Sequence, residues 1–513
     1  MTTPTERKQA PTHLEDVATT NQHVMLGGTE VHFVDASMIE KASCAHELKT
    51  ASDGKTVLIP RPSDDLADPL NWSQLRKCLV LLVISCTAFL PDYGSGTGAV
   101  TLIPQAKEWG LSEDTVNHSQ VGNVFMLGAG GLVVTVLTSY FGRLPTLFWF
   151  LVLALWTAAW CAGSRTFDQF MAARILNGFF STVAQGGGMI YIQDIFFLHE
   201  HARMINVWSG AIILSPYLGP LIAAFIINTT KWQWAFGIYT IETGLCILMT
   251  VLFVDETFYD RDLGAAQQPM KGSRVLRLVG IEQFRNRHLR QTLATAVMRP
   301  LKIISKPTVF LSSIYYCFTL AWAVGINTTL SIFLGPLYGF GLKQIGFFYF
   351  SPVIAALIGE LVGHWLHDAA AKYYMQRHRG QFEPEARLQV IWCATPFMIT
   401  GLALFGFCLE RKYHYMVTAI AWGLYVFGVM IATVGINAYN LDSYPEASGE
   451  VTAWINMART TGGFIVSYFQ VKWAQSVGTE VSFGTQAGIV GAMFSLVVIM
   501  QLWGKKMRDW ARD

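Results

Sequence analysis

Two opposite charges stand inside long apolar runs of this sequence: Asp92 in the first run, and Arg174 in the run from Phe170 to Ile192. A guanidinium keeps its proton in a protein, and placing it at the centre of a bilayer costs about 2.5–3.5 kcal/mol on insertion scales. It therefore needs a partner or a water-filled cavity. Asp92 is the lone acid of the first run, so we predict that it pairs with Arg174.

Two interpretations of this pair are open. It can be a fixed ion pair that locks two helices together, or a switch in which protonation of Asp92, or a cationic substrate, frees Arg174. We favour the switch because ionisable residues inside a membrane usually mark ion or proton pathways. Asp92 is then the proton site and Arg174 its coupling partner. Glu242 is a candidate second proton site, although a hydrogen bond between helices explains it equally well, and Arg459 needs a partner that we cannot name from the sequence.

A further titratable cluster contains Glu360, His364, His367 and Asp368. Two histidines three residues apart beside an acid can bind a metal, but no other group of ligands supports such a site. We expect an interfacial gate there, and neither a metal nor a cofactor. The eight cysteines stand singly, which fits small residues of a membrane core better than a disulfide framework. No phosphate-binding glycine loop ending in Lys-Ser/Thr occurs, which argues against an ATP-driven pump.

The elements that carry these charges follow from composition and run length. The chain has 513 residues, 52% hydrophobic and only 14% charged, with a net charge of +2. A soluble domain carries about a quarter charged residues, and the net charge gives no reason to expect nucleic acid as a partner. Apolar runs of roughly 20 residues, the length that crosses a bilayer as a helix, recur twelve times, at 78–100, 119–141, 146–164, 168–192, 205–227, 234–254, 307–334, 344–366, 389–409, 415–437, 450–474 and 484–504.

The longest internal connection divides these spans into two halves of six. We predict a cytoplasmic, disordered tail over 1–77, a six-helix half over 78–254, a basic cytoplasmic linker over 255–306, a second half over 307–504 and a short tail over 505–513. Most of the 37 Lys and Arg residues fall in the tails, the linker and alternate loops. By the positive-inside rule this places both termini in the cytoplasm.

Between the halves we expect a cavity for a substrate. The polar and aromatic candidates for its wall are Tyr217, Tyr315, Tyr316, Asn327, Asn437 and Asn456. The fifth span contains two prolines four residues apart, flanked by small residues that allow close helix packing; the residues of this packing motif are Gly210, Pro216, Gly219 and Pro220. Pro91 and the glycines at 94, 96 and 98 suggest an irregular first span. Two Asn-x-Ser/Thr sequons face outward, at Asn117 and Asn228, with Asn117 the better glycosylation candidate.

Several segments resemble the Major Facilitator Superfamily, and within it the fungal twelve-span drug:proton antiporters. Arg174-Ile-Leu-Asn-Gly178 matches the span 4 motif whose arginine the family links to proton coupling, and Gly210 to Pro220 resembles the span 5 antiporter motif. The segments 68–77, 255–257, 383–388 and 442–445 are also similar to the fungal group. The resemblance covers roughly 66–504, and it implies an all-α polytopic fold of twelve helices in two six-helix halves.

One departure from the family concerns the loop between spans 2 and 3. Gly142-Arg143 is present, but Ser139 stands where the family has an acid and Leu144 where it has a basic residue. The resemblance therefore implies a gating loop at Gly142 and Arg143 whose charge lock is weakened.

These observations predict a proton-coupled secondary transporter and not an enzyme. The first choice is export, by antiport, of a small hydrophobic or weakly cationic organic compound, such as a xenobiotic or secondary metabolite. Uptake of an organic cation or polyamine by symport is the alternative, and a nontransporting membrane sensor is a distant third. The partners of the predicted transporter would be protons, a small organic substrate and the lipid bilayer. We expect a monomer in the plasma membrane, with the vacuolar membrane as the other location.

Overall fold

The computed structural model describes residues 60–510 except 61, 64, 66, 261–271, 288–291, 378–382 and 445–446, and most of the predicted N-terminal tail lies outside them. The N-terminal half contains α3 (Gln74–Trp109), α4 (Glu113–Tyr140), α5 (Arg143–Gly163), α6 (Phe167–Ser181), α7 (Val183–Ile195), α8 (Leu198–Thr229) and α9 (Gln233–Phe253). The C-terminal half contains α13 (Pro307–Tyr338), α14 (Leu342–Phe348), α15 (Phe350–Arg377), α16 (Val390–Glu410), α17 (Tyr415–Ser443), α18 (Ser448–Val477) and α19 (Thr479–Trp510).

Each predicted span corresponds to helix in the structure. Ten helices of the described part are long and apolar enough to cross a membrane. The fourth span is divided at Thr182 into α6 and α7, and the eleventh is the more polar α18, which contains Arg459. The fold is thus all-α, with twelve spans in two halves.

The outer faces of the bundle are apolar, as lipid contact requires. On α9, Ile241, Leu245, Leu248 and Leu252 recur at helical spacing, and each exposes more than half of its surface. In a soluble protein such a stripe would mark an interface; here it faces the bilayer.

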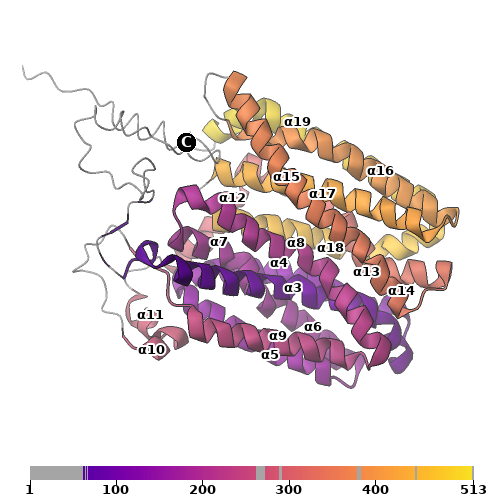
Figure 1. The fold of residues 1–513 in the computed structure, drawn as a ribbon, viewed down its shortest axis with the longest axis horizontal. Coiled ribbons are helices and arrows are strands. Elements are labelled where there is room, and N and C mark those ends of the chain that lie inside the picture. The colour runs from indigo at the N-terminus through magenta and orange to yellow at the C-terminus, as the bar shows by residue number, and fades with distance from the viewer. Residues whose placement is uncertain are drawn as a thin grey trace, which may run out of the picture.

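The two halves lie side by side with their helices roughly parallel (Figure 1). Contacts between the halves run along α4 and α18, and along α8 with α14 and α15. The short linker helices α10 (Arg274–Val279), α11 (Ile281–Arg285) and α12 (Leu293–Ile304) lie at one end of the bundle, the predicted cytoplasmic end.

Charged contacts attach the linker to the N-terminal half. Asp255 accepts hydrogen bonds from Arg277 at 2.9 Å and from Arg76 at 3.2 Å. Burial opposes ionisation of Asp255, but the hydrogen bond from Arg277 and the charges of both arginines outweigh it and hold the pKa of this carboxyl below its usual value. The start of the first span and the linker are therefore held together by ionised groups.

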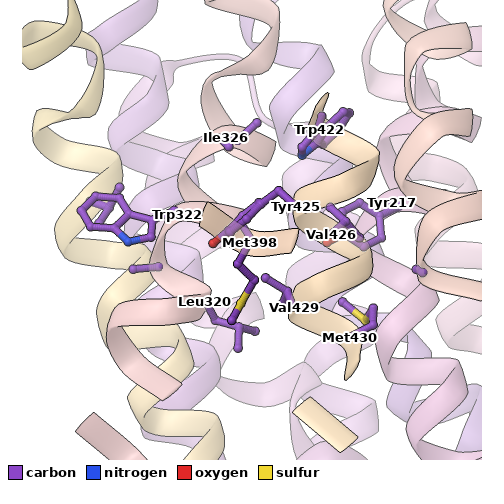
Figure 2. Packing of buried hydrophobic residues seen from close by; sticks show 14 of the residues in the cluster. Tyr217, Leu320, Trp322, Ile326, Met398, Trp422, Tyr425, Val426, Val429 and Met430 are labelled. Carbon is purple, nitrogen blue, oxygen red and sulfur yellow. The ribbon is translucent and has the colours of Figure 1, made fainter. Parts of the chain in front are cut away.

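The core of the C-terminal half is built from α13, α16 and α17 (Figure 2). Trp422, Tyr425 and Val426 on α17 are fully buried, and the Tyr425 hydroxyl donates to Thr319 O at 2.5 Å. Across the boundary between the halves, the rings of Tyr217 and Trp422 pack edge to face with centroids 6.2 Å apart. This core gives α13 and α17 fixed positions on one side of the central cavity.

The first span is a continuous helix, so the predicted irregularity was wrong. Pro91 lies inside α3 without ending it. The glycines serve close packing instead: a Cβ on Gly94 would lie 2.6 Å from the Tyr239 ring, and one on Gly96 would lie 2.7 Å from Pro220 Cδ. Helix α9 approaches α3 closely at Gly94, and α8 does so at Gly96, because these positions carry no side chain.

The prolines of α8 supply a contact between the halves. Pro220 has no N–H, so the carbonyl of Pro216, four residues earlier, loses its helical partner. Asn327 of α13 donates its side-chain N–H to this oxygen at 3.0 Å. The predicted packing motif therefore also provides a hydrogen-bond acceptor at the centre of the molecule.

Gly219→Ala is expected to destabilise the protein, because the added Cβ would lie 2.4 Å from the backbone oxygen of Tyr93. Forcing α3 and α8 apart should cost about 1–3 kcal/mol, measured as lower thermal stability in detergent. Gly210→Ala, on the same helix, is the matched control: no atom lies within 4 Å of its Cβ position. It should be neutral or slightly stabilising, and equal losses for the two variants would contradict the packing argument.

Candidate functional site

A cavity opens between the two halves near the middle of the bundle. It contains about 1110 Å³ of empty space, part of it open to solvent. Residues of α3, α4, α7 and α8 line one side and residues of α13, α17 and α18 the other, among them Asp92, Gln120, Gln185, Trp208, Tyr217, Tyr316, Asn327, Asn437, Asn456 and Arg459. Much of the remaining lining is apolar, including Ile212, Leu320 and Met430. The size and lining suit a small amphipathic organic molecule.

The structure places five of the six predicted wall residues on this cavity, and Tyr315 is the exception. Tyr315 is 1% exposed and lies beside Thr395 of α16, inside the C-terminal half. Consecutive residues of a helix point about 100° apart. Tyr316 faces the cavity, whereas Tyr315 points into the C-terminal half.

Asp92 forms an ion pair with Arg459. Arg459 Nη2 on α18 lies 2.9 Å from Asp92 Oδ2 on α3, so the pair joins the two halves across the cavity. Gln185 Nε2 donates to the same oxygen at 2.8 Å, and Arg459 also donates to Asn456 Oδ1 at 2.8 Å. The side chains of Asp92 and Arg459 are only 10% and 13% exposed. Arg459, for which the sequence named no partner, is the counter-ion of Asp92.

The predicted pairing of Asp92 with Arg174 was therefore wrong. Arg174 donates to the backbone oxygens of Gly94 at 2.7 Å and Ser95 at 3.1 Å, and to Gln120 Oε1. These acceptors are uncharged, and two of them belong to the helix turn that follows Asp92. These carbonyl oxygens accept hydrogen bonds from both terminal nitrogens of the guanidinium, whereas its Nε makes no hydrogen bond to the described part of the chain.

Local sequence explains how Arg174 reaches α3. A Cβ at Gly98 would lie 2.5 Å from Arg174 Nη2 and 2.1 Å from Gln120 Oε1. Only glycine leaves room for the guanidinium between α3 and α4. The ring of Phe236 on α9 lies 5.3 Å from the guanidinium carbon and adds a cation–π contact. Arg174 thus connects four helices of one half. Any part it takes in proton coupling, which we still propose, would act through these contacts and not through a direct pair with Asp92.

Glu242 is separate from the cavity. It lies on α9, where its carboxyl interacts with the hydroxyl of Tyr93 on α3. Tyr93 is 1% exposed and packs between the two helices. This contact favours the hydrogen bond between helices that the sequence left open as the role of Glu242.

The His364 cluster contacts the other half near the predicted cytoplasmic end. His364 on α15 lies 3.1 Å from Asn206 Nδ2 on α8. Ligand atoms of His364, His367 and Asp368 lie within 4.8 Å of one another, but Arg387 Nη1 is 3.4 Å from Asp368 Oδ1. A guanidinium beside the acid disfavours a bound cation. The cluster fits the predicted gate better than a metal site.

Asn206→Ala should favour the conformation that is open at this end. Losing one hydrogen bond of about 1 kcal/mol shifts an equilibrium about fivefold. The readout is the rate at which a cysteine placed at Thr452, on the cavity wall, reacts with an impermeant maleimide added from that side. His367→Gln is the control, because His367 bonds the backbone of its own helix at His364 O. Equal rates in all three proteins would argue against a gate here.

Arg143 has an acidic partner despite Ser139. Its Nε lies 3.0 Å from Asp194 Oδ2 at the end of α7, and its backbone N–H donates to Glu256 at 3.1 Å. Gly142 adopts a φ of 112°, which favours glycine, and Leu144 is fully buried. The gating loop is therefore held by an ion pair within its own half.

Of the two sequons, the structure favours Asn228 as the glycosylation candidate, whereas the sequence favoured Asn117. Asn117 lies in the second turn of α4 and is 1% exposed, so a glycosyltransferase cannot reach it in this structure. Asn228 is exposed in the last turn of α8 and stays a proposed glycosylation site. The sequence placed Asn117 in a loop, whereas Ser112 accepts a hydrogen bond from the Thr115 N–H and starts the helix before it.

Several cavity residues were not predicted from the sequence, among them Gln120, Gln185 and Trp208. Gln185 precedes three glycines in an apolar run, and an amide in such a run is itself a signal, because it needs partners in a membrane. Gln120 and Trp208 lie near predicted span ends, where polar and aromatic residues are common. No comparable signal distinguished them.

Twelve spans arranged in two halves around a central, charged cavity are the architecture of a membrane transporter. The sequence profile of the Major Facilitator Superfamily matches residues 84–467. This chain belongs to the Major Facilitator Superfamily.

Curated relatives of similar length are fungal transporters. The efflux pump radE of Floropilus chiversii is 25% identical over 497 residues, covering 93% of this chain and 89% of the relative. The MFS transporter fsa7 of a Fusarium species is 27% identical over 454 residues, covering 87% and 88%. Among solved structures, the xylose transporter XylE from E. coli, in a partially occluded inward open conformation, superposes with a TM-score of 0.57 at 16% identity, covering 84% of this chain and 99% of XylE. That likeness concerns the fold alone.

Proposed function

We propose that this transporter exports a small organic compound in exchange for protons, with Asp92 as the proton site. One observation carries the proposal: an acid and a base from opposite halves form a buried ion pair on the wall of the central cavity. The name of the relative from Floropilus chiversii, an efflux pump, supports export as the direction. We propose the plasma membrane as its location.

Protonation of Asp92 would change how strongly the ion pair holds the two halves together. A neutral Asp92 can still accept a hydrogen bond from Arg459 but loses the charge–charge attraction, so one link between α3 and α18 weakens when the proton binds. Gln185 and Asn456 remain hydrogen-bonding partners for each side separately. The state of one carboxyl thus changes how strongly the two halves are held together at the cavity, which is the requirement for coupling proton binding to alternating access.

Transport by purified protein in vesicles tests this function. A compound loaded inside should leave faster when the outer solution is more acidic and membrane potential is clamped at zero. With one proton per molecule, each pH unit supports about a tenfold concentration gradient. Flux that does not depend on the pH gradient would refute proton coupling. Accumulation of the compound inside, driven by an acidic outer solution, would support the symport alternative in place of export.

A further inference from the structure

We infer that the exported substrate is an uncharged molecule with hydrogen-bonding groups, and that each transport cycle carries one net positive charge inward. The inference rests on the proposed function and adds the charge of the substrate. It starts from the cavity wall: among the described residues that line it, Asp92 and Arg459 are the two with formal charges.

The two charges satisfy each other without a ligand. Asp92 receives hydrogen bonds from Arg459 and Gln185, and Arg459 reaches Asn456 as well. The neighbouring titratable groups of the lining are Tyr217 on α8 and Tyr316 on α13, which are neutral phenols at physiological pH. Glu360 on α15 interacts with Tyr316 but is not part of the lining. With Asp92 ionised, the net charge of the cavity is therefore zero.

A charged substrate would have to break this pair. A cation needs Asp92 and would leave the Arg459 guanidinium unpaired beside it, whereas an anion needs Arg459 and would strand the carboxylate. Removing one partner of a buried pair is strongly unfavourable. An uncharged molecule avoids both losses.

Polar atoms in the lining indicate what an uncharged molecule would offer. Gln185 Oε1, Asn327 Oδ1 and Asn456 Nδ2 are buried and make no hydrogen bond to the described part of the chain. Two are acceptors and one is a donor, and all three residues face the cavity. A ligand with hydroxyl or amide donors and a carbonyl acceptor would pair with them, while Ile212, Leu320 and Met430 would contact its apolar part.

The charge moved per cycle follows from comparing two states of the cavity, one with Asp92 ionised and one with Asp92 protonated. The substrate leaves while Asp92 is ionised, so the loaded cavity carries no net charge. On the return, Asp92 carries a proton taken from outside, the cavity has a charge of +1 from Arg459, and the proton is released inside. The balance is one neutral molecule out and one proton in, so an inside-negative potential should accelerate export.

Vesicle flux with two classes of probe tests the inference. The panel pairs uncharged compounds bearing amide and hydroxyl groups, such as cycloheximide, with permanent cations of similar size, such as tetraphenylphosphonium. We expect pH-driven export of uncharged members, accelerated by an inside-negative potential set with valinomycin. The inference is overturned if cations are exported in preference to uncharged compounds, or if pH-driven export does not change with the membrane potential. Either result leaves the proposed function standing. Failure of every compound to respond to pH at zero potential refutes the proposed function itself.

Binding of tetraphenylphosphonium at pH 8.5 provides a test that needs no transport. Arg459→Gln leaves a net charge of −1 in the cavity and should bind this cation at least about tenfold more tightly than the unmodified protein. The double variant Asp92→Asn/Arg459→Gln restores neutrality and should lose that gain, which controls for damage to the fold. Equal affinity in the unmodified protein and Arg459→Gln would overturn the inference.

Discussion

Replacing Asp92 with asparagine is expected to abolish proton-driven export while preserving the fold. Asparagine has nearly the same shape, and its side-chain oxygen can still accept hydrogen bonds from Arg459 and Gln185. It cannot bind and release a proton, so vesicle flux should fall to the leak rate under a pH gradient. Equilibrium binding of the substrate should remain, because the cavity keeps its shape.

Asp92→Glu serves as the matched control for this variant. It retains a titratable carboxyl, one methylene further from the backbone, and should keep part of the pH-driven flux. If Asp92→Asn transports with an undiminished pH dependence, the ion pair is a structural lock and the proton site lies elsewhere.

Replacing Arg459 with methionine is expected to lower the free energy of unfolding by about 3–5 kcal/mol, because Asp92 is then a buried charge without its counter-ion. The measurement is denaturant or thermal unfolding in detergent. Adding Asp92→Asn to the same chain should recover much of the loss. A double variant as unstable as the single one would show that Arg459 acts by packing and not by charge.

Arg174→Met distinguishes the observed ion pair of Asp92 with Arg459 from the pair of Asp92 with Arg174 that the sequence predicted. In the structure it removes a donor from Gln120 and from two backbone oxygens but leaves Asp92 paired. The loss should be about 1–3 kcal/mol, the cost of an unsatisfied buried polar group. If Arg174 were the counter-ion of Asp92, the order of the two arginine variants would be reversed.

Sequence reasoning succeeded where one strong physical rule dominates. A bilayer requires apolar helices of a set length, so run length alone located all twelve spans. Counting residues from the predicted span ends puts Arg174 at about the depth of Asp92, and Arg174 does contact the next turn of α3. The atoms it contacts were beyond prediction, because a single sequence does not show which backbone oxygens a glycine leaves accessible.

The pairing of Arg459 failed for a different reason. Counted from the predicted span ends, Arg459 lies roughly 14 Å from the inner surface and Asp92 roughly 21 Å. Nothing in these depths suggested a contact. The contact depends on how the two halves pack together, which a single sequence does not show.

The division of the fourth span at Thr182 leaves α7 as a short separate helix with contacts at both of its ends. At one end of α7, Gln185 holds the carboxylate of Asp92. At the other end, Gln193 bonds Ser448 of the opposite half, and Asp194 holds Arg143. The two ends are about 12 Å apart along the helix, and α6 does not continue the rod beyond Thr182. Gln185, which contacts the carboxyl that gains or loses the proton, therefore belongs to the same helix whose other end contacts Ser448 of the opposite half and Arg143 at the start of α5.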